Sequence, residues 1–319
     1  MTQDPECLKH FPVSLFASVM GIAGLSIAFQ RFATVFAAAH GVGVALLAVA
    51  YLLFATLVIV YGLKFFRHRP EVIAELKHPV RANFFPAISI GLLLLGIATL
   101  DFSPLAAKAL WLAGSLLHLG FSLFIIAKWI TSDYEIAHSN PTWFIPVVGN
   151  ILVPIAGVEL AGREVSWFFF SVGIFFWVAL FTIVFYRLIF HHQLAQKFIP
   201  TLFILIAPPA VGFVAYVKLT GGVDPFARIL FYVALFFVLL LASMFRHFFR
   251  VRFFVSWWAY TFPLCAVTIA TTLAAKLLAS GLLVWVAGGL LAVSTAAVAL
   301  VSAKTIEAVC RKTLCEAEE

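Results

Sequence analysis

The feature that most constrains this chain is a series of apolar stretches, each about 20 residues long, separated by short polar segments. A stretch of about that length crosses the hydrocarbon core of a bilayer as one α-helix. The apolar runs are continuous, whereas outer-membrane strands alternate in and out, so the pattern predicts helices rather than a barrel. We expect an all-α integral membrane protein with ten spans, at residues 11–30, 40–63, 82–100, 106–128, 142–160, 166–189, 198–219, 226–245, 253–275 and 281–303.

The composition agrees with a chain that lies almost entirely in lipid. Of 319 residues, 64% are hydrophobic and only 11% are charged, against about 25% charged in an ordinary soluble domain. The ten spans leave no separate soluble region, so we expect one transmembrane domain over residues 1–319. The first apolar run is too long for a signal peptide and is followed by Arg31, so we expect it to stay in the protein.

The basic residues predict the orientation of the spans. With both termini in the cytoplasm, the cytoplasmic segments hold 15 of the 21 Lys and Arg residues. This asymmetry follows the positive-inside rule and fits an even number of spans. The short loops are typical of a multi-pass protein of a prokaryotic cell inner membrane.

The prolines divide the spans into two groups. Every proline that we place within a span falls in an odd-numbered one, and the positions are Pro12, Pro86, Pro146, Pro154, Pro208, Pro209 and Pro263. Proline removes an intrahelical hydrogen bond, and in lipid the freed carbonyl needs a partner from a neighbouring helix or water. We therefore expect five helical hairpins, in which kinked odd-numbered helices surround a central pore and straight even-numbered helices lie outside.

The sequence contains none of the motifs HExxH, GxSxG, Walker A or GxGxxG, so we expect neither an enzyme nor a cofactor. The cysteines are few and show no CxxC spacing, so we expect neither disulfides nor a metal site; they are Cys7, Cys265, Cys310 and Cys315. Nothing indicates nucleic-acid binding. Six acids lie at span ends or in loops, which argues against cation conduction and ion-coupled pumping; they are Asp101, Asp133, Glu135, Glu159, Glu164 and Asp224.

Three side chains are candidates for a direct role in transport. Arg81 stands beside Pro79 at the entrance to a kinked helix, where it would add to a basic, anion-concentrating vestibule, although such residues also enforce topology. Phe262 precedes Pro263 and could hold a ring across the path; the alternative is ordinary packing. His118 lies deep in the fourth span, where we expect one interhelical hydrogen bond rather than a proton-sensitive site.

Several segments, in order along nearly the whole chain, resemble the tellurite-resistance and dicarboxylate transporter family, which includes the TehA proteins and the plant slow anion channels. The segments are Phe11 to Gly24 with Phe16 and Gly21, His78-Pro79-Val80-Arg81, Pro141 to Pro146, Ala207-Pro208, and Trp258-Ala259-Tyr260-Thr261-Phe262. The resemblance implies five hairpins around a pore within each subunit of a homotrimer. It also implies that Phe262 closes the pore, and it suggests Phe16, Gly21, Pro86, Asn150, Pro208 and Pro263 as pore-lining residues.

Two features depart from the family pattern. Pro263 follows the gate residue and Pro209 stands beside Pro208. Both prolines can shift the kink, so the resemblance does not determine the exact pose of the gate residue. The long tails of the plant channels are also missing. Our hypothesis is a passive channel for small anions such as chloride and nitrate, with the lipid bilayer as its surroundings. The alternatives are a carrier for C4-dicarboxylates such as malate or for tellurite and sulfite, and a membrane scaffold without a central path.

Overall fold

The structure is a computed structural model that describes residues 5–311 and 313. Over those residues the secondary structure is helical and contains no strand. Ten helical segments are long and apolar enough to cross a membrane, which confirms the ten predicted spans; they are Val13–Phe32, Ala39–Arg67, Arg81–Thr99, Pro104–Thr131, Pro141–Leu160, Arg163–Phe190, Gln196–Thr220, Pro225–Ser243, Val255–Leu277 and Gly281–Cys310. The side chain of Cys7, together with Cys315 and both chain ends, lies outside the described residues.

The even-numbered spans are single uninterrupted helices. They are α3 (Ala39–Arg67), α6 (Pro104–Thr131), α9 (Arg163–Phe190), α11 (Pro225–Ser243) and α14 (Gly281–Cys310). The last one continues seven residues past its predicted end at 303 because Glu307 pairs with both Lys304 and Arg311 at 2.9 Å, which supports the helix after the apolar run stops.

The odd-numbered spans are each built from 3₁₀ and α segments. Four of them begin with a 3₁₀ segment and continue as one α-helix: η1 (Val13–Leu15) into α2 (Phe16–Phe32), η2 (Arg81–Phe84) into α5 (Pro86–Thr99), η6 (Gln196–Ile206) into α10 (Ala207–Thr220), and η7 (Val255–Tyr260) into α13 (Thr261–Leu277). The fifth alternates as η4 (Pro141–Trp143), α7 (Phe144–Val148), η5 (Gly149–Leu152) and α8 (Val153–Leu160). The irregular positions that we predicted as kinks are the points where a 3₁₀ segment changes to an α segment.

Most of the span prolines stand where an α segment starts. Pro86, Pro154 and Pro208 occupy the first or second position of α5, α8 and α10, and Pro263 is the third residue of α13. The first turn of an α-helix has no intrahelical partner for its N–H groups, so proline loses nothing there and its fixed φ suits the helix. The prolines therefore mark where 3₁₀ segments give way to α5, α8, α10 and α13, whereas α2 begins at Phe16 without one.

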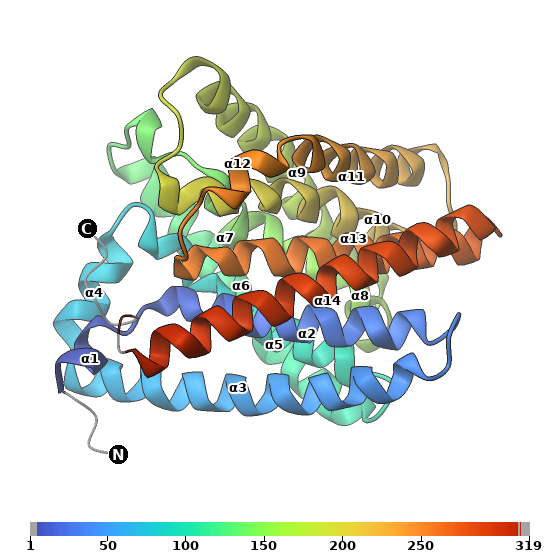
Figure 1. Ribbon diagram of the computed structural model, residues 1–319, viewed down its shortest axis with the longest axis horizontal. Coiled ribbons are helices and arrows are strands. Elements are labelled where there is room, and N and C mark those ends of the chain that lie inside the picture. Colours follow the sequence, from blue (N-terminus) through green and yellow to red (C-terminus); the bar gives the residue numbers. More distant parts are fainter. Residues whose placement is uncertain (1–4, 312, 314–319) are drawn as a thin grey trace.

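Each inner span is joined to the outer span that follows it by a short turn, and all five turns lie at one end of the bundle (Figure 1). Ser103, Asp224 and Ser280 cap α6, α11 and α14 by accepting hydrogen bonds from the backbone N–H groups of Ala106, Ala227 and Leu283. The longer connections lie at the opposite end, with α1 (Pro5–His10), α4 (Arg69–Lys77), η3 (Ile136–His138) and α12 (Phe245–Phe249). We call this second end the α4 end.

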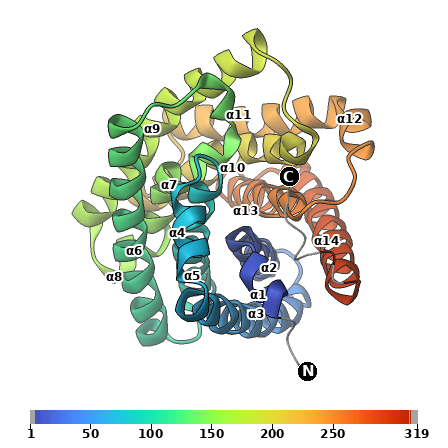
Figure 2. The ribbon, with the colours of Figure 1, turned by 90° about the vertical axis from the view of Figure 1, so that its left-hand side faces the viewer.

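Burial separates the two groups of spans as predicted. Between 67% and 89% of the most apolar window of each odd-numbered span is buried, against 22% to 33% for each even-numbered span. In the end-on view the five even-numbered helices lie at the periphery and enclose the others (Figure 2). The fold is therefore five helical hairpins with the interrupted helices inside, and we refer to inner spans and outer helices from here on.

Candidate functional site

Three cavities lie one after another among the inner spans. The central cavity has a volume of about 80 Å³, and the α4-side cavity and the Arg31-side cavity have volumes of about 490 and 240 Å³. Ser14, Phe84 and Ser256 line both the central and the α4-side cavity. Leu152, Val211 and Phe262 line both the central and the Arg31-side cavity. The cavities therefore form a row from one end of the bundle to the other.

All five inner spans contribute to the wall of the central cavity, and its described lining residues include no charged side chain. Most of the wall is aliphatic or aromatic. The hydroxyl groups belong to Ser14, Thr201 and Ser256, which lie in the 3₁₀ segments η1, η6 and η7. The changes of helix type that the prolines mark therefore occur around this cavity.

Phe262 stands at the boundary between the central and the Arg31-side cavity. It is the second residue of α13 and its side chain is 8% exposed. A Cβ atom on Gly24 of α2 would lie 3.1 Å from Cδ2 of the Phe262 ring, so the ring rests against a position where α2 has no side chain. The absence of a side chain at Gly24 lets the ring pack closely against α2.

The α4-side cavity is lined by more cationic than anionic side chains. The cations are Lys9, Lys64, Arg81 and Lys197, and the carboxylates are Glu71 and Glu75. His78 also lines this cavity. Partial burial lowers the pKa of His78, and the positive charge of nearby side chains, Arg81 foremost, lowers it further. Its Nδ1 accepts hydrogen bonds from the N–H groups of Val80 and Arg81 at 3.1 Å, which requires that nitrogen to be unprotonated.

A buried ion pair stands in the wall of the α4-side cavity. Lys64 Nζ lies 2.8 Å from Glu75 Oε1 and donates to the carbonyl of Phe11 at 2.8 Å, and Tyr61 donates to Glu75 Oε2 at 2.6 Å. The Lys64 side chain is 1% exposed. The network joins α3 and α4 to the chain just before the first inner span. Each charge is paired and hydrogen-bonded, as burial of a charge demands.

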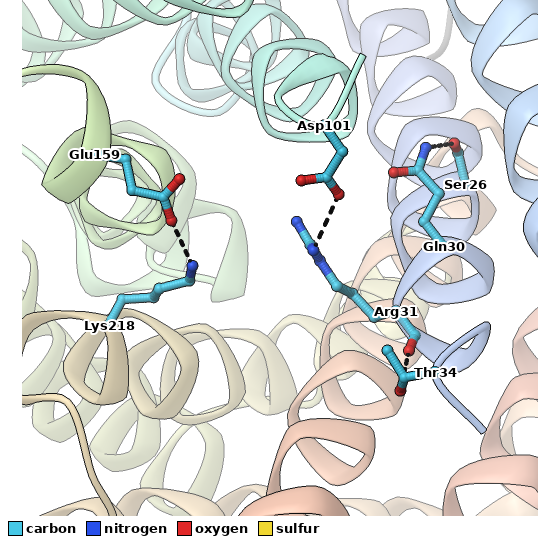
Figure 3. A network of polar contacts seen from close by, with 7 residues as sticks. All are labelled: Ser26, Gln30, Arg31, Thr34, Asp101, Glu159 and Lys218. Atoms are coloured by element: carbon cyan, nitrogen blue, oxygen red, sulfur yellow. Dashed lines mark hydrogen bonds and ion pairs between the residues drawn. The ribbon is translucent and has the colours of Figure 1, made fainter. Parts of the chain in front are cut away.

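The Arg31-side cavity carries cations from three inner spans. Arg31, Lys218 and Lys276 line it. Figure 3 shows Arg31 paired with Asp101 and Lys218 paired with Glu159, at 3.2 and 2.7 Å. All four side chains are at least 36% exposed. Such exposed pairs contribute only about 0–1 kcal/mol, so their cations stay accessible to other anions.

The structure brings half of the residues predicted for the site to the row of cavities. Phe262, Pro208 and Pro263 line the central cavity, and Arg81 lines the α4-side cavity. The other four are Phe16, Gly21, Pro86 and Asn150, and the linings of the three cavities do not include them.

These four residues pack between helices. Phe16 is 1% exposed and makes edge-to-face contacts with Phe54 and Tyr61 of the outer helix α3. Gly21 is packed against Thr261 and Trp258 at the start of α13, where a Cβ would overlap the Thr261 hydroxyl. These positions lie on inner spans but face neighbouring helices.

The other two belong to a polar contact between α5, α6 and the inner span Pro141–Leu160. Ser89 Oγ donates to the Pro86 carbonyl at 2.8 Å and lies 2.9 Å from His118 Nδ1. Asn150 donates from Nδ2 to Ser122 Oγ at 2.9 Å. The His118 contact is an interhelical hydrogen bond to a serine, as the sequence predicted. Asn150 therefore connects the inner span Pro141–Leu160 to α6.

The Lys64 and Glu75 pair and the serines between the cavities are not evident from the sequence. Lys64 ends an apolar helix, where a lysine is ordinarily a topology signal, and Glu75 lies 11 residues further on. A lysine three residues after a tyrosine on one helix face was the available signal. No group of three or more His, Cys, Asp or Glu side chains that could hold a metal ion occurs between residues 5 and 311 or at 313.

Comparison with known proteins places the chain in a family. Residues 10–306 match the voltage-dependent anion channel family, SLAC1. An uncharacterized transporter of Methanocaldococcus jannaschii is 31% identical over 83% of this chain and 84% of its own length. The S-type anion channel SLAH3 of Arabidopsis thaliana is 30% identical over 83% of this chain but 43% of its own length. The tellurite resistance protein TehA homolog of Haemophilus influenzae is 28% identical over 82% of this chain and 80% of its own. The chain, with its ten spans in five hairpins, therefore belongs to the voltage-dependent anion channel family.

Proposed function

We propose that this protein is a channel through which small anions such as chloride and nitrate cross the membrane, and that Phe262 is its gate. One observation carries the proposal: Phe262 lines both the central and the Arg31-side cavity, and cations line the row of cavities at both ends. Relatives named as S-type anion channels and a TehA homolog support anion transport as the general activity.

The charge distribution favours anions over cations. Cationic side chains at both ends raise the local concentration of anions and lower that of cations. The wall of the central cavity has no charged group among its described residues, so an anion there is not held tightly and can leave. Selectivity then depends on width and electrostatic potential, without a dedicated charged binding site and without a cofactor.

The Phe262 ring supplies the barrier. A ring across a narrow apolar passage excludes water, and the desolvated ion then has no partners to replace its hydration shell. The ring packs closely against Gly24 of α2, so opening the passage requires the Phe262 side chain to leave this contact.

The test is anion current in wild type, Phe262→Ala and the control Phe16→Ala under voltage clamp, with chloride replaced in turn by nitrate and malate. Phe16 is also a buried phenylalanine on an inner span, but the linings of the three cavities do not include it. We expect large, weakly selective anion currents in Phe262→Ala alone. Surface labelling confirms that each variant reaches the membrane.

Two results would contradict the channel. Silence of all three proteins while labelled malate, tellurite or sulfite still exchanges, with saturation, would favour a carrier that works by alternating access. Equal currents in Phe16→Ala and Phe262→Ala would remove the special role of Phe262.

We further propose a homotrimer in the cell inner membrane, with each row of cavities inside one subunit and both termini in the cytoplasm. Exposed Phe, Leu and Ile on the outer helices suit both lipid and subunit contacts. Native mass spectrometry in nanodiscs tests the assembly, and protease access to tags at the two ends tests the orientation.

A further inference from the structure

The passage between the central and the α4-side cavity is bordered by Ser14, Phe84 and Ser256, which line both cavities. We call these three residues the neck. Each comes from a different 3₁₀ segment, η1, η2 or η7, and η1 packs against both of the others. The neck is thus formed where three inner spans enter the bundle, at the side of the central cavity opposite Phe262.

The neck contains hydroxyl groups that the protein itself does not use. Ser256 Oγ is buried and has no hydrogen-bond partner within residues 5–311 and 313. The Ser14 hydroxyl makes no hydrogen bond with another described residue. By contrast, the hydroxyl of Ser18, four residues later, donates to the Leu15 carbonyl at 2.6 Å. A buried hydroxyl without a partner is unfavourable, because it has lost its hydrogen bonds to water. A polar group in such a position is a candidate for binding something that passes.

We propose that the neck is a binding site for a small, partly dehydrated anion, in which the Ser14 and Ser256 hydroxyl hydrogens replace water that the anion loses on leaving the α4-side cavity. The inference rests on the proposed function and adds a site that discriminates between anions by how strongly they hold water. The two serines are specificity-determining groups, separate from the gate at Phe262.

The chemistry around the neck selects an anion as the occupant. A serine oxygen can also bind a cation, but the α4-side cavity next to the neck carries more cations than carboxylates. Phe84, the third residue of the neck, has an aromatic ring, and the edge of such a ring carries partial positive charge. Hydrogen bonds to a charged partner are stronger than those between neutral groups. The hydroxyls therefore favour an anion over water.

The experiment measures the permeability of chloride relative to thiocyanate, which is more weakly hydrated, in the Phe262→Ala background where the gate is removed. Ser256→Ala and Ser14→Ala are added singly and together. We expect each single variant to lower the chloride to thiocyanate ratio about threefold to tenfold, because chloride loses the groups that replace its water. Ser256→Thr keeps the hydroxyl and should keep the ratio.

Two hydroxyls already in use supply the controls. Thr201 lines the central cavity but its hydroxyl donates to the Phe198 carbonyl, and Ser18 is buried with its hydroxyl bound to Leu15. Thr201→Val and Ser18→Ala should leave the permeability ratio unchanged. A change in these controls equal to that in Ser256→Ala would overturn the site.

The outcomes separate the site from the channel. Current in Phe262→Ala with an unchanged ratio in all serine variants overturns the neck site and leaves the channel standing. An equal fall of chloride and thiocyanate currents means that the neck holds only water, which also overturns the site. No anion current in Phe262→Ala, with protein in the membrane, overturns the channel and the site together.

Discussion

The central cavity shares lining residues with each of the two end cavities but has the opposite chemistry. The central wall has no charged side chain among its described residues, whereas seven Lys and Arg residues line the two ends. A charge is tolerated at the ends because water or a nearby carboxylate compensates it, and in the centre neither is at hand. The ends therefore determine how many anions arrive, and the centre determines whether they pass.

The same negative charge should act very differently in the two regions. Val211 is 7% exposed and lines the central cavity, while Thr34 is exposed and lines the Arg31-side cavity. In the Phe262→Ala background, Val211→Glu should lower anion current on the order of 100-fold and Thr34→Glu only about twofold to fivefold, since water screens the exposed carboxylate. Current measurement at equal surface expression checks this. Val211→Gln separates charge from size, and an equal loss in both glutamate variants would refute the contrast.

Some charged side chains at the α4 end are buried and others are exposed. Two carboxylates on α4, Glu75 and Glu71, allow a comparison of the two cases. Glu75→Gln leaves the buried Lys64 ammonium without its partner and should cost about 3–5 kcal/mol of folding stability. Glu71 pairs with Lys9 at 3.8 Å near the surface, so Glu71→Gln should cost about 0–1 kcal/mol. Thermal unfolding in detergent compares the two. Equal melting temperatures would mean that Lys64 finds another partner when Glu75 is neutral.

The cations at the α4 end should act through their field. Arg81→Gln, in the Phe262→Ala background, should lower anion current about twofold to fivefold at low ionic strength, and the difference should shrink as salt screens the charge. Arg69 is exposed on α4 and the linings of the cavities do not include it, so Arg69→Gln should change current less. A loss in Arg81→Gln that persists at high salt would point to a direct contact instead.

The smallest effect concerns His78 and pH. The pKa of His78 is lowered in the folded protein by partial burial and nearby positive charge, so the folded state resists its protonation. Its contribution to stability is therefore complete above the ordinary pKa of about 6.5 and is lost as pH falls below it. His78→Asn should melt with a weaker dependence on pH between about 7.5 and 5. An unchanged pH dependence of melting in His78→Asn would contradict this assignment.

Much of the fold could be predicted because bilayer thickness fixes the length of each span and each helix satisfies its own backbone in lipid. The restriction of prolines to odd-numbered spans also predicted which helices lie inside. It did not predict that Pro86, Pro154 and Pro208 start α segments after 3₁₀ segments. Helix type within an apolar run depends on contacts with neighbouring helices, which sequence alone does not contain.

The candidate site was predicted only in part. Phe262, Pro208, Pro263 and Arg81 lie at the cavities, whereas Phe16 and Gly21 on the correct inner spans face neighbouring helices. An inner span is buried on nearly all sides, so its apolar residues show no periodicity that marks the side facing the cavity. The rotation of a helix about its axis is set by packing.

The sequence by itself determined the class of protein, the ten spans, their grouping into hairpins and the excess of positive charge. These properties follow from length, hydropathy and composition, which act locally along the chain. Only the tertiary structure decided that Lys64 meets Glu75, that the Phe262 ring packs against Gly24, and that Ser14 and Ser256 border one passage. Those contacts join residues from different helices, so they exist only once the helices have packed at fixed rotations and depths.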